Sequence, residues 1–175
     1  MEWRAFELHP EIPPEGMSLP SHLQSYFGGM QTRLKQMADE AGLAIVFSDW
    51  IPNSRRALEA SEYAREHGKH EAFHTAVFNK FYGKGEDLGS WTMLRAAAEE
   101  VGLDSEAMQH RTEADHYKAI VDAQFAEARR LGITGVPVYI FDSKYAIVGA
   151  QPYDAFKEVM THVLAEAVNN EVESV

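Results

Sequence analysis

The chain has 175 residues, a formal net charge of -11 and no cysteine, and its length fits one domain with room for an inserted subdomain. The acidic balance argues against nucleic acid and anionic membrane surfaces as partners, because neutralising phosphates requires clusters of Lys and Arg. The lack of cysteine excludes disulfides, thiolate metal sites and cysteine nucleophiles among these residues. No apolar run approaches the length that spans a bilayer and no signal peptide is recognisable, so we expect a cytoplasmic protein.

The first fifty residues predict a strand, a helix and a short extended segment. Residues 2–8 have the pattern of a strand, and the prolines and glycine of residues 10–16 end it. A helix is expected from about residue 20 to residue 40, closed by Gly42. The apolar run at residues 44–50 is bounded by turn residues, and it fits either a strand or an extended connector.

The middle of the chain predicts a series of helices. Asn53 is placed as the N-cap of a helix that ends at Gly68. A second helix follows over residues 70–82. Four apolar side chains are expected on one broad face of this second helix: Phe73, Val77, Phe78 and Phe81.

Three further helices complete this region. One opens at Ser90 or Thr92 and stops at Gly102, Asp104 caps a short one, and residues 113–131 form a long one. Helical segments that stand between two strand regions indicate a helical insertion in a mixed domain.

The last third predicts a β-hairpin followed by a helix. Strands at residues 138–141 and 145–148 are rich in β-branched and aromatic side chains, and Asp142-Ser143-Lys144 turns one into the other. Gly149-Ala150-Gln151-Pro152 ends the second strand, and a helix follows over residues 153–168. That helix is expected to present five apolar side chains to the core: Phe156, Val159, Met160, Val163 and Leu164.

The dipeptide Val136-Pro137 stands directly before the first strand of this hairpin. A proline at the start of a strand removes no needed ladder N–H, so an ordinary trans bond is one interpretation. The other is a cis bond, which re-aims the backbone at a tight turn. With Thr134 and Gly135 before it, this corner is the candidate substrate-binding site, because an exposed backbone edge can pair with an extended peptide.

Metal binding is not expected. His67, His70 and His74 have the spacing of one helix face, but Gly68 interrupts the helix between the first two. No carboxylate completes a ligand set, so we expect solvated side chains near a helix start and no metal. No cofactor is expected either.

The stretch from the Gly132 turn through Val136-Pro137, the hairpin, Gly149-Ala150-Gln151-Pro152 and the Phe156 helix resembles the C-terminal half of the DsbA-like thioredoxin family. It is most similar to the FrnE-type branch, whose relatives include 2-hydroxychromene-2-carboxylate isomerases and kappa-class glutathione transferases. Residues 3–10 resemble the family's second strand and its exit. Softer matches to its inserted helices lie at residues 52–58, 68–78 and 101–104.

The resemblance implies an α/β fold: a thioredoxin-like domain with an inserted all-helical subdomain. The thioredoxin-like core would consist of residues 1–18 and 132–175, and residues 19–131 would form the helical insertion and a connecting helix. Family members begin with a strand and a Cys-Pro-x-Cys pair at a helix N-terminus, which lowers the pKa of the attacking thiol. This first strand and helix are missing here, which leaves the core incomplete.

Three explanations for the missing unit stay open. In the first, the start of the chain is assigned too far downstream or the chain has been shortened. In the second, the protein is genuinely short and completes its sheet in a homodimer. In the third, another chain supplies the strand and helix. Because two strand edges are left unpaired, we expect self-association.

The resemblance implies a DsbA/FrnE-like thiol-disulfide oxidoreductase, but without cysteine we expect the chain to be redox-inactive and assign no catalytic residue. Val136 and Pro137 would present backbone to a peptide or thiol substrate. One alternative is a glutathione-dependent isomerase or transferase relative, in which Asn53 lines the substrate or glutathione site rather than only capping its helix. The other is a non-catalytic dimeric module that binds peptides at Val136-Pro137.

Overall fold

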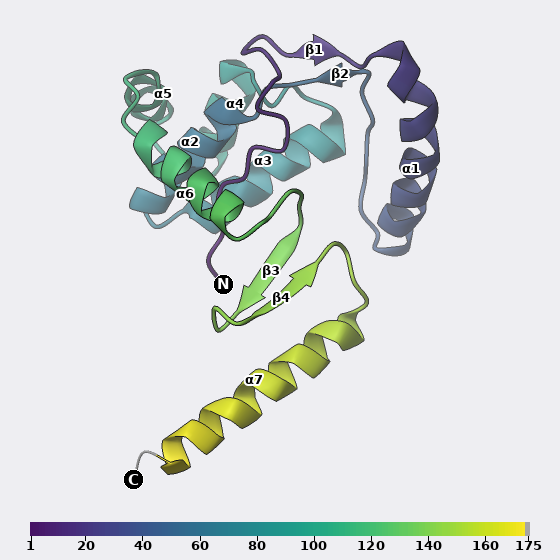
Figure 1. Ribbon diagram of the computed structural model, residues 1–175. Coiled ribbons are helices and arrows are strands. Elements are labelled where there is room, and N and C mark those ends of the chain that lie inside the picture. The colour runs from purple at the N-terminus through teal and green to yellow at the C-terminus, as the bar shows by residue number, and fades with distance from the viewer. Residues whose placement is uncertain (174–175) are drawn as a thin grey trace. The chain divides into compact units, whose positions relative to one another are not determined.

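The computed structural model describes residues 1–173, apart from the side chains of residues 22–27 and 168–173. The chain divides into two compact units, Met1–Ala126 and Glu127–Val175, and helix α6 (Lys118–Arg130) crosses the boundary (Figure 1). Seven helices and four short strands make the described chain a mixed α/β protein, the class that the sequence predicts.

Four helices form the core of the first unit: α2 (Arg55–Glu66), α3 (His70–Lys84), α4 (Trp91–Glu100) and α5 (Ser105–Glu113). Alanines with no exposed surface lie on α2 and α4, and such small side chains let neighbouring helices approach closely. Larger side chains fill the space between the helices. The buried core consists of Ala57, Ala60, Tyr63, Ala64, Phe73, Ala76, Val77, Met93, Leu94, Ala97, Ala98, Leu103, Met108 and Tyr117.

Local signals set the ends of these helices. The Asp104 carboxylate accepts the N–H groups of Glu106 at 3.1 Å and Ala107 at 2.9 Å, so the predicted cap of α5 is confirmed. Helix α3 ends at Gly85, which has the left-handed φ of 70°. A Cβ at that position would lie 2.9 Å from Cγ1 of Val46, so the chain needs glycine there for both its conformation and its space.

The long helix predicted over residues 113–131 is confirmed as α6 up to its end, but its predicted start is five residues too early. Helix α5 ends at Glu113, a turn with Asp115 at φ 58° follows, and α6 begins at Lys118. The turn places Tyr117 in the core at 2% exposure, where its hydroxyl donates to Glu66 at 2.7 Å. Burial of a large aromatic side chain therefore outweighs the local preference for a continuous helix.

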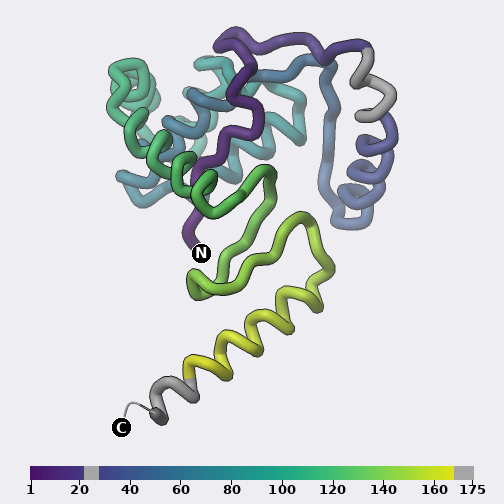
Figure 2. Tube along the Cα trace, in the orientation of Figure 1, coloured from purple at the N-terminus to yellow at the C-terminus, as the bar shows by residue number. Residues whose placement is uncertain are grey.

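The strand predicted at residues 2–8 is wrong. This segment, which Figure 2 traces from the N-terminus, belongs to no ladder. A strand requires a neighbouring backbone to pair with, and in the described part of the first unit the Ala5 N–H instead donates to the side chain of Gln124 at 2.6 Å.

Helix α1 (Ser21–Glu40) is confirmed. The two strands of a short ribbon come before and after this helix in the sequence. Strand β1 (Met17–Ser18) pairs antiparallel with β2 (Trp50–Ile51). Of the predicted apolar run 44–50, only Trp50 is in a strand, and residues 44–49 form an extended connector. Val46 in this connector donates its N–H to the carbonyl of Tyr82 at 2.7 Å.

The second unit is a hairpin with a helix on one face. Strands β3 (Val138–Phe141) and β4 (Tyr145–Val148) pair antiparallel, as predicted, and α7 runs over Tyr153–Glu173. Phe156 of α7 packs edge-on against Tyr139 at 4.9 Å between ring centroids. Two side chains predicted in the core, Met160 and Leu164, are 43% and 60% exposed, because two strands are too narrow to cover a wider stripe of the helix.

Candidate substrate-binding site

A tight corner leads from α6 into β3. Gly132 ends the helix with φ 72° and donates its N–H to the carbonyl of Arg129 at 3.0 Å. The Val136-Pro137 peptide bond is cis. The carbonyl of Pro137 accepts the Gly149 N–H at 2.8 Å, which fastens the corner to the far end of β4.

The four residues predicted at this corner are adjacent on the surface of the second unit. Thr134, Val136 and Pro137 are exposed, and Gly135 is half-buried. Val136, at 53% exposure, is a large apolar side chain held in solvent. When an extended peptide adds to a strand edge, main-chain hydrogen bonds give affinity and contacts to its side chains give specificity.

One edge of β3 has no neighbouring strand within the described second unit. Val138 lies opposite Val148 in the ladder. The neighbouring pair, Pro137 and Gly149, is joined by the hydrogen bond from the Gly149 N–H to the Pro137 carbonyl. In an antiparallel ladder the residues next to such a bond form a non-hydrogen-bonded pair, so their main-chain groups point away from the partner strand. Val138 and Ile140 therefore turn their N–H and C=O groups toward the unpaired edge.

The two faces of the hairpin differ. Tyr139 and Phe141 face α7, where both rings contact Phe156. On the other face Ile140 and Val148 are 48% and 65% exposed. An extended segment added at the edge of β3 would thus find both unpaired main-chain groups and apolar side chains.

Asn53, the fifth predicted site residue, belongs to the first unit and is half-buried. Its Nδ2 donates to the carbonyl of Ile12 at 2.6 Å, and its Oδ1 accepts the Arg55 N–H at 2.8 Å. Ser54 occupies the cap position but makes no side-chain cap hydrogen bond, so the bond from the Arg55 N–H to Asn53 performs the capping role predicted for Asn53. Asn53 therefore ties the start of α2 to the loop at Ile12, and each polar atom keeps capacity for one more hydrogen bond.

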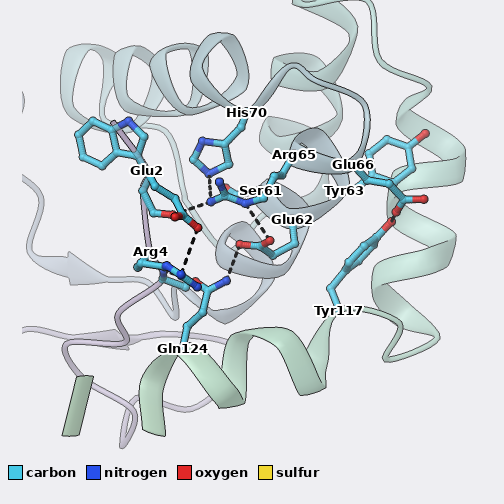
Figure 3. A network of polar contacts seen from close by, with 12 residues as sticks. Glu2, Arg4, Ser61, Glu62, Tyr63, Arg65, Glu66, His70, Tyr117 and Gln124 are labelled. Atoms are coloured by element: carbon cyan, nitrogen blue, oxygen red, sulfur yellow. Dashed lines mark hydrogen bonds and ion pairs between the residues drawn. The ribbon is translucent and has the colours of Figure 1, made fainter. Parts of the chain in front are cut away.

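A polar network in the first unit was not predicted (Figure 3). The carboxylate of Glu62, 5% exposed, accepts from Arg65 and from Gln124, each at 3.0 Å. Arg65 also donates to the carbonyl of Trp3 at 2.6 Å and contacts His70 at 3.1 Å. These residues stand up to 121 positions apart in the sequence, and no local pattern pairs them. They fasten the N-terminal segment to α2 and α6.

Two other charged clusters also lie inside the first unit. Burial lowers the pKa of Arg55, but hydrogen bonds to Glu59 at 2.6 Å and Asp122 at 2.7 Å outweigh burial and raise it. Hydrogen bonds from Tyr117 and Arg111 lower the pKa of Glu66. Each of these charged groups has an oppositely charged partner, so neither cluster presents an unpaired reactive group.

The three histidines considered for a metal make other contacts. His74 is half-buried and stacks between Trp3 and Phe78, with ring centroids at 4.4 Å and 4.2 Å. Burial lowers the pKa of His74, and burial followed by the charge of Arg65 lowers that of His70. The expectation of solvated side chains is therefore wrong for these two. Among the described residues no group of three His, Asp or Glu side chains could hold a metal ion.

The described helices include none that is long and apolar enough to cross a membrane.

The sequence model of the DsbA-like thioredoxin domain matches residues 1–161, so the chain belongs to that family. The crystal structure of a probable DsbA oxidoreductase from Streptomyces coelicolor superposes with a TM-score of 0.81 at 26% identity, covering 93% of this chain and 74% of that one. Both findings confirm the thioredoxin-like fold and the family resemblance inferred from the sequence.

Two proteins are similar in sequence. The uncharacterized protein YwbO of Bacillus subtilis is 30% identical over 167 residues, which are 92% of this chain and 80% of YwbO. A 2-hydroxychromene-2-carboxylate isomerase of Sphingobium xenophagum is 31% identical over 85 residues, 49% of this chain and 44% of the isomerase. The chain is therefore similar both to a probable oxidoreductase and to an isomerase, whereas these 175 residues contain no thiol to attack a disulfide.

Proposed function

We propose that this chain binds an extended polypeptide along the free edge of β3, beside Val136-Pro137, and recognises its substrate without exchanging disulfides. The outward-facing main chain of Val138 and Ile140, next to the exposed corner, is the observation that carries this proposal. A two-stranded hairpin is marginal by itself, so a third strand would stabilise it as well as satisfy its edge.

The surroundings of the edge favour a particular kind of ligand. The exposed side chains of Val136 and Ile140 offer apolar contacts to an added strand. The net charge of -11 favours neutral or basic polypeptides. The likeness to a probable DsbA oxidoreductase supports polypeptides that carry cysteine as the substrate class.

Fluorescence anisotropy with labelled insulin B chain, reduced and carboxamidomethylated so that it is unfolded and free of thiols, tests the proposal. Ile140→Pro removes one outward N–H from the edge and no N–H from the ladder with β4, whereas Ile140→Val keeps that N–H. We expect Ile140→Pro to weaken binding by roughly tenfold, about one hydrogen bond, and Ile140→Val to bind as the unchanged chain does. Equal affinity of all three proteins, with the hairpin intact by NMR, would exclude the β3 edge.

A glutathione-dependent isomerase-like activity is the second candidate, favoured by the 31% identity to the Sphingobium xenophagum isomerase. Asn53 would then contact the ligand through the hydrogen-bonding capacity that its bonds to Ile12 and Arg55 leave over. When glutathione is titrated into the 15N-labelled chain, the NMR signal of the Asn53 side-chain amide should shift. Asn53→Ala should weaken glutathione binding. An unchanged spectrum at saturating glutathione would remove this candidate.

A further inference from the structure

Helix α1 carries an apolar stripe, and none of the described helices or strands makes an extensive contact with this helix. Met30, Leu34 and Met37 are 41%, 39% and 43% exposed. Steps of four and then three residues place them on one face of the helix, as in the seam of a coiled coil.

Two opposite charges flank this stripe on the same side. Arg33 and Glu40 are seven residues apart, so they occupy equivalent positions in the repeat. Arg33 makes no ion pair among the described residues, and the carboxylate of Glu40 accepts only from the neutral amide of Gln36, at 2.9 Å. By contrast, Lys35 and Asp39, which point away from the stripe, pair within the helix at 2.8 Å.

We infer that the stripe is a self-association surface, on which α1 of a second copy packs antiparallel. In that arrangement Arg33 of each copy meets the partner's Glu40, which gives two identical ion pairs around a two-fold axis. A parallel arrangement would set Arg33 beside the partner's Ala38 and leave both charges unpaired. Unbranched methionine side chains suit such a seam because they adapt to the facing surface. The inference does not depend on peptide binding, which concerns the second unit.

Sedimentation velocity of the full chain measures the dimer dissociation constant. Leu34→Glu places a charge in the middle of the seam, and Thr32→Glu places the same charge on the opposite face of α1 as a matched control. We expect Leu34→Glu to weaken the dimer at least about 100-fold, because two copies each bury a carboxylate, and Thr32→Glu to change it by less than about twofold. Circular dichroism checks that both variants keep their helices.

Charge exchange tests the antiparallel register. Arg33→Glu and Glu40→Arg should each weaken the dimer roughly tenfold, because each sets like charges against one another twice. The double variant Arg33→Glu/Glu40→Arg should restore the affinity of the unchanged chain. A chain that stays monomeric at millimolar concentration, a dimer that tolerates Leu34→Glu, or a double variant as weak as the single ones would each overturn the inference.

Discussion

Replacing Gln124 by Leu removes the side chain that joins the N-terminal segment to α2 through α6. Its Oε1 accepts the Ala5 N–H at 2.6 Å, and its Nε2 donates to the Glu62 carboxylate at 3.0 Å. Gln124, Ala5 and Glu62 are only 7%, 8% and 5% exposed, so water cannot readily replace the lost partner. Leu has a similar volume, which limits the effect to the hydrogen bonds.

The expected loss follows from these contacts. A buried N–H without a partner costs about 1–3 kcal/mol, and Glu62 loses one of its donors while keeping Arg65. Together we expect the N-terminal segment to be destabilised by about 3 kcal/mol, which is roughly a hundredfold change in its opening equilibrium. Native-state hydrogen exchange at the Ala5 amide measures that equilibrium directly.

A second variant at the same position separates the two bonds. Gln124→Glu keeps an acceptor for Ala5 but places a carboxylate beside Glu62, which raises the pKa of the pair in the folded state. The folded variant then holds more protons than the unfolded one, so its stability falls as the pH rises through that pKa.

The first variant, Gln124→Leu, decides whether the network is assigned correctly. If the Ala5 amide exchanges as slowly in Gln124→Leu as in the unchanged chain, the assignment of the network is refuted.

Three further predictions concern other parts of the chain. Asp104→Ala should lower the free energy of unfolding of the first unit by about 1 kcal/mol in urea titrations; an unchanged midpoint would show that the cap contributes nothing. Burial lowers the pKa of His74, so its contribution to stability is complete above about pH 6.5 and is lost as the pH falls. His74→Phe, which keeps a ring between Trp3 and Phe78, should therefore lose less stability on acidification than the unchanged chain, and an identical pH profile would contradict this. The purified chain should not accelerate reduction of insulin by dithiothreitol, and any turnover above background would show that our account of its chemistry is wrong.

Local signals predicted the elements whose ends are fixed by local chemistry. Asp104 caps α5 through its own carboxylate, and Asp142 and Ser143 turn the hairpin with φ values of 49° and 55°. The candidate corner around Val136-Pro137 was found in the same way, because a proline before a β-branched strand is visible in the sequence. Such features depend only on residues a few positions apart.

Features that depend on distant residues were missed. Residues 2–8 have the side-chain pattern of a strand, but in the described first unit the Ala5 N–H bonds a side chain of α6. The pattern over residues 113–131 is helical, yet Tyr117 interrupts it to reach the core. Phe78 was expected on one broad apolar face with Phe73, but Phe73 is buried and Phe78 is 48% exposed, where it stacks on His74. In each case a tertiary contact decided between locally acceptable states.

Amide chemical-shift mapping tests the central claim most directly, with the 15N-labelled chain titrated with unlabelled, carboxamidomethylated insulin B chain. Our account predicts the largest shifts at the exposed corner and along β3, from Gly135 to Phe141, with smaller ones on β4. No shifts at millimolar peptide, or shifts confined to the first unit, would contradict the claim that this DsbA-like chain binds polypeptides at the edge of β3.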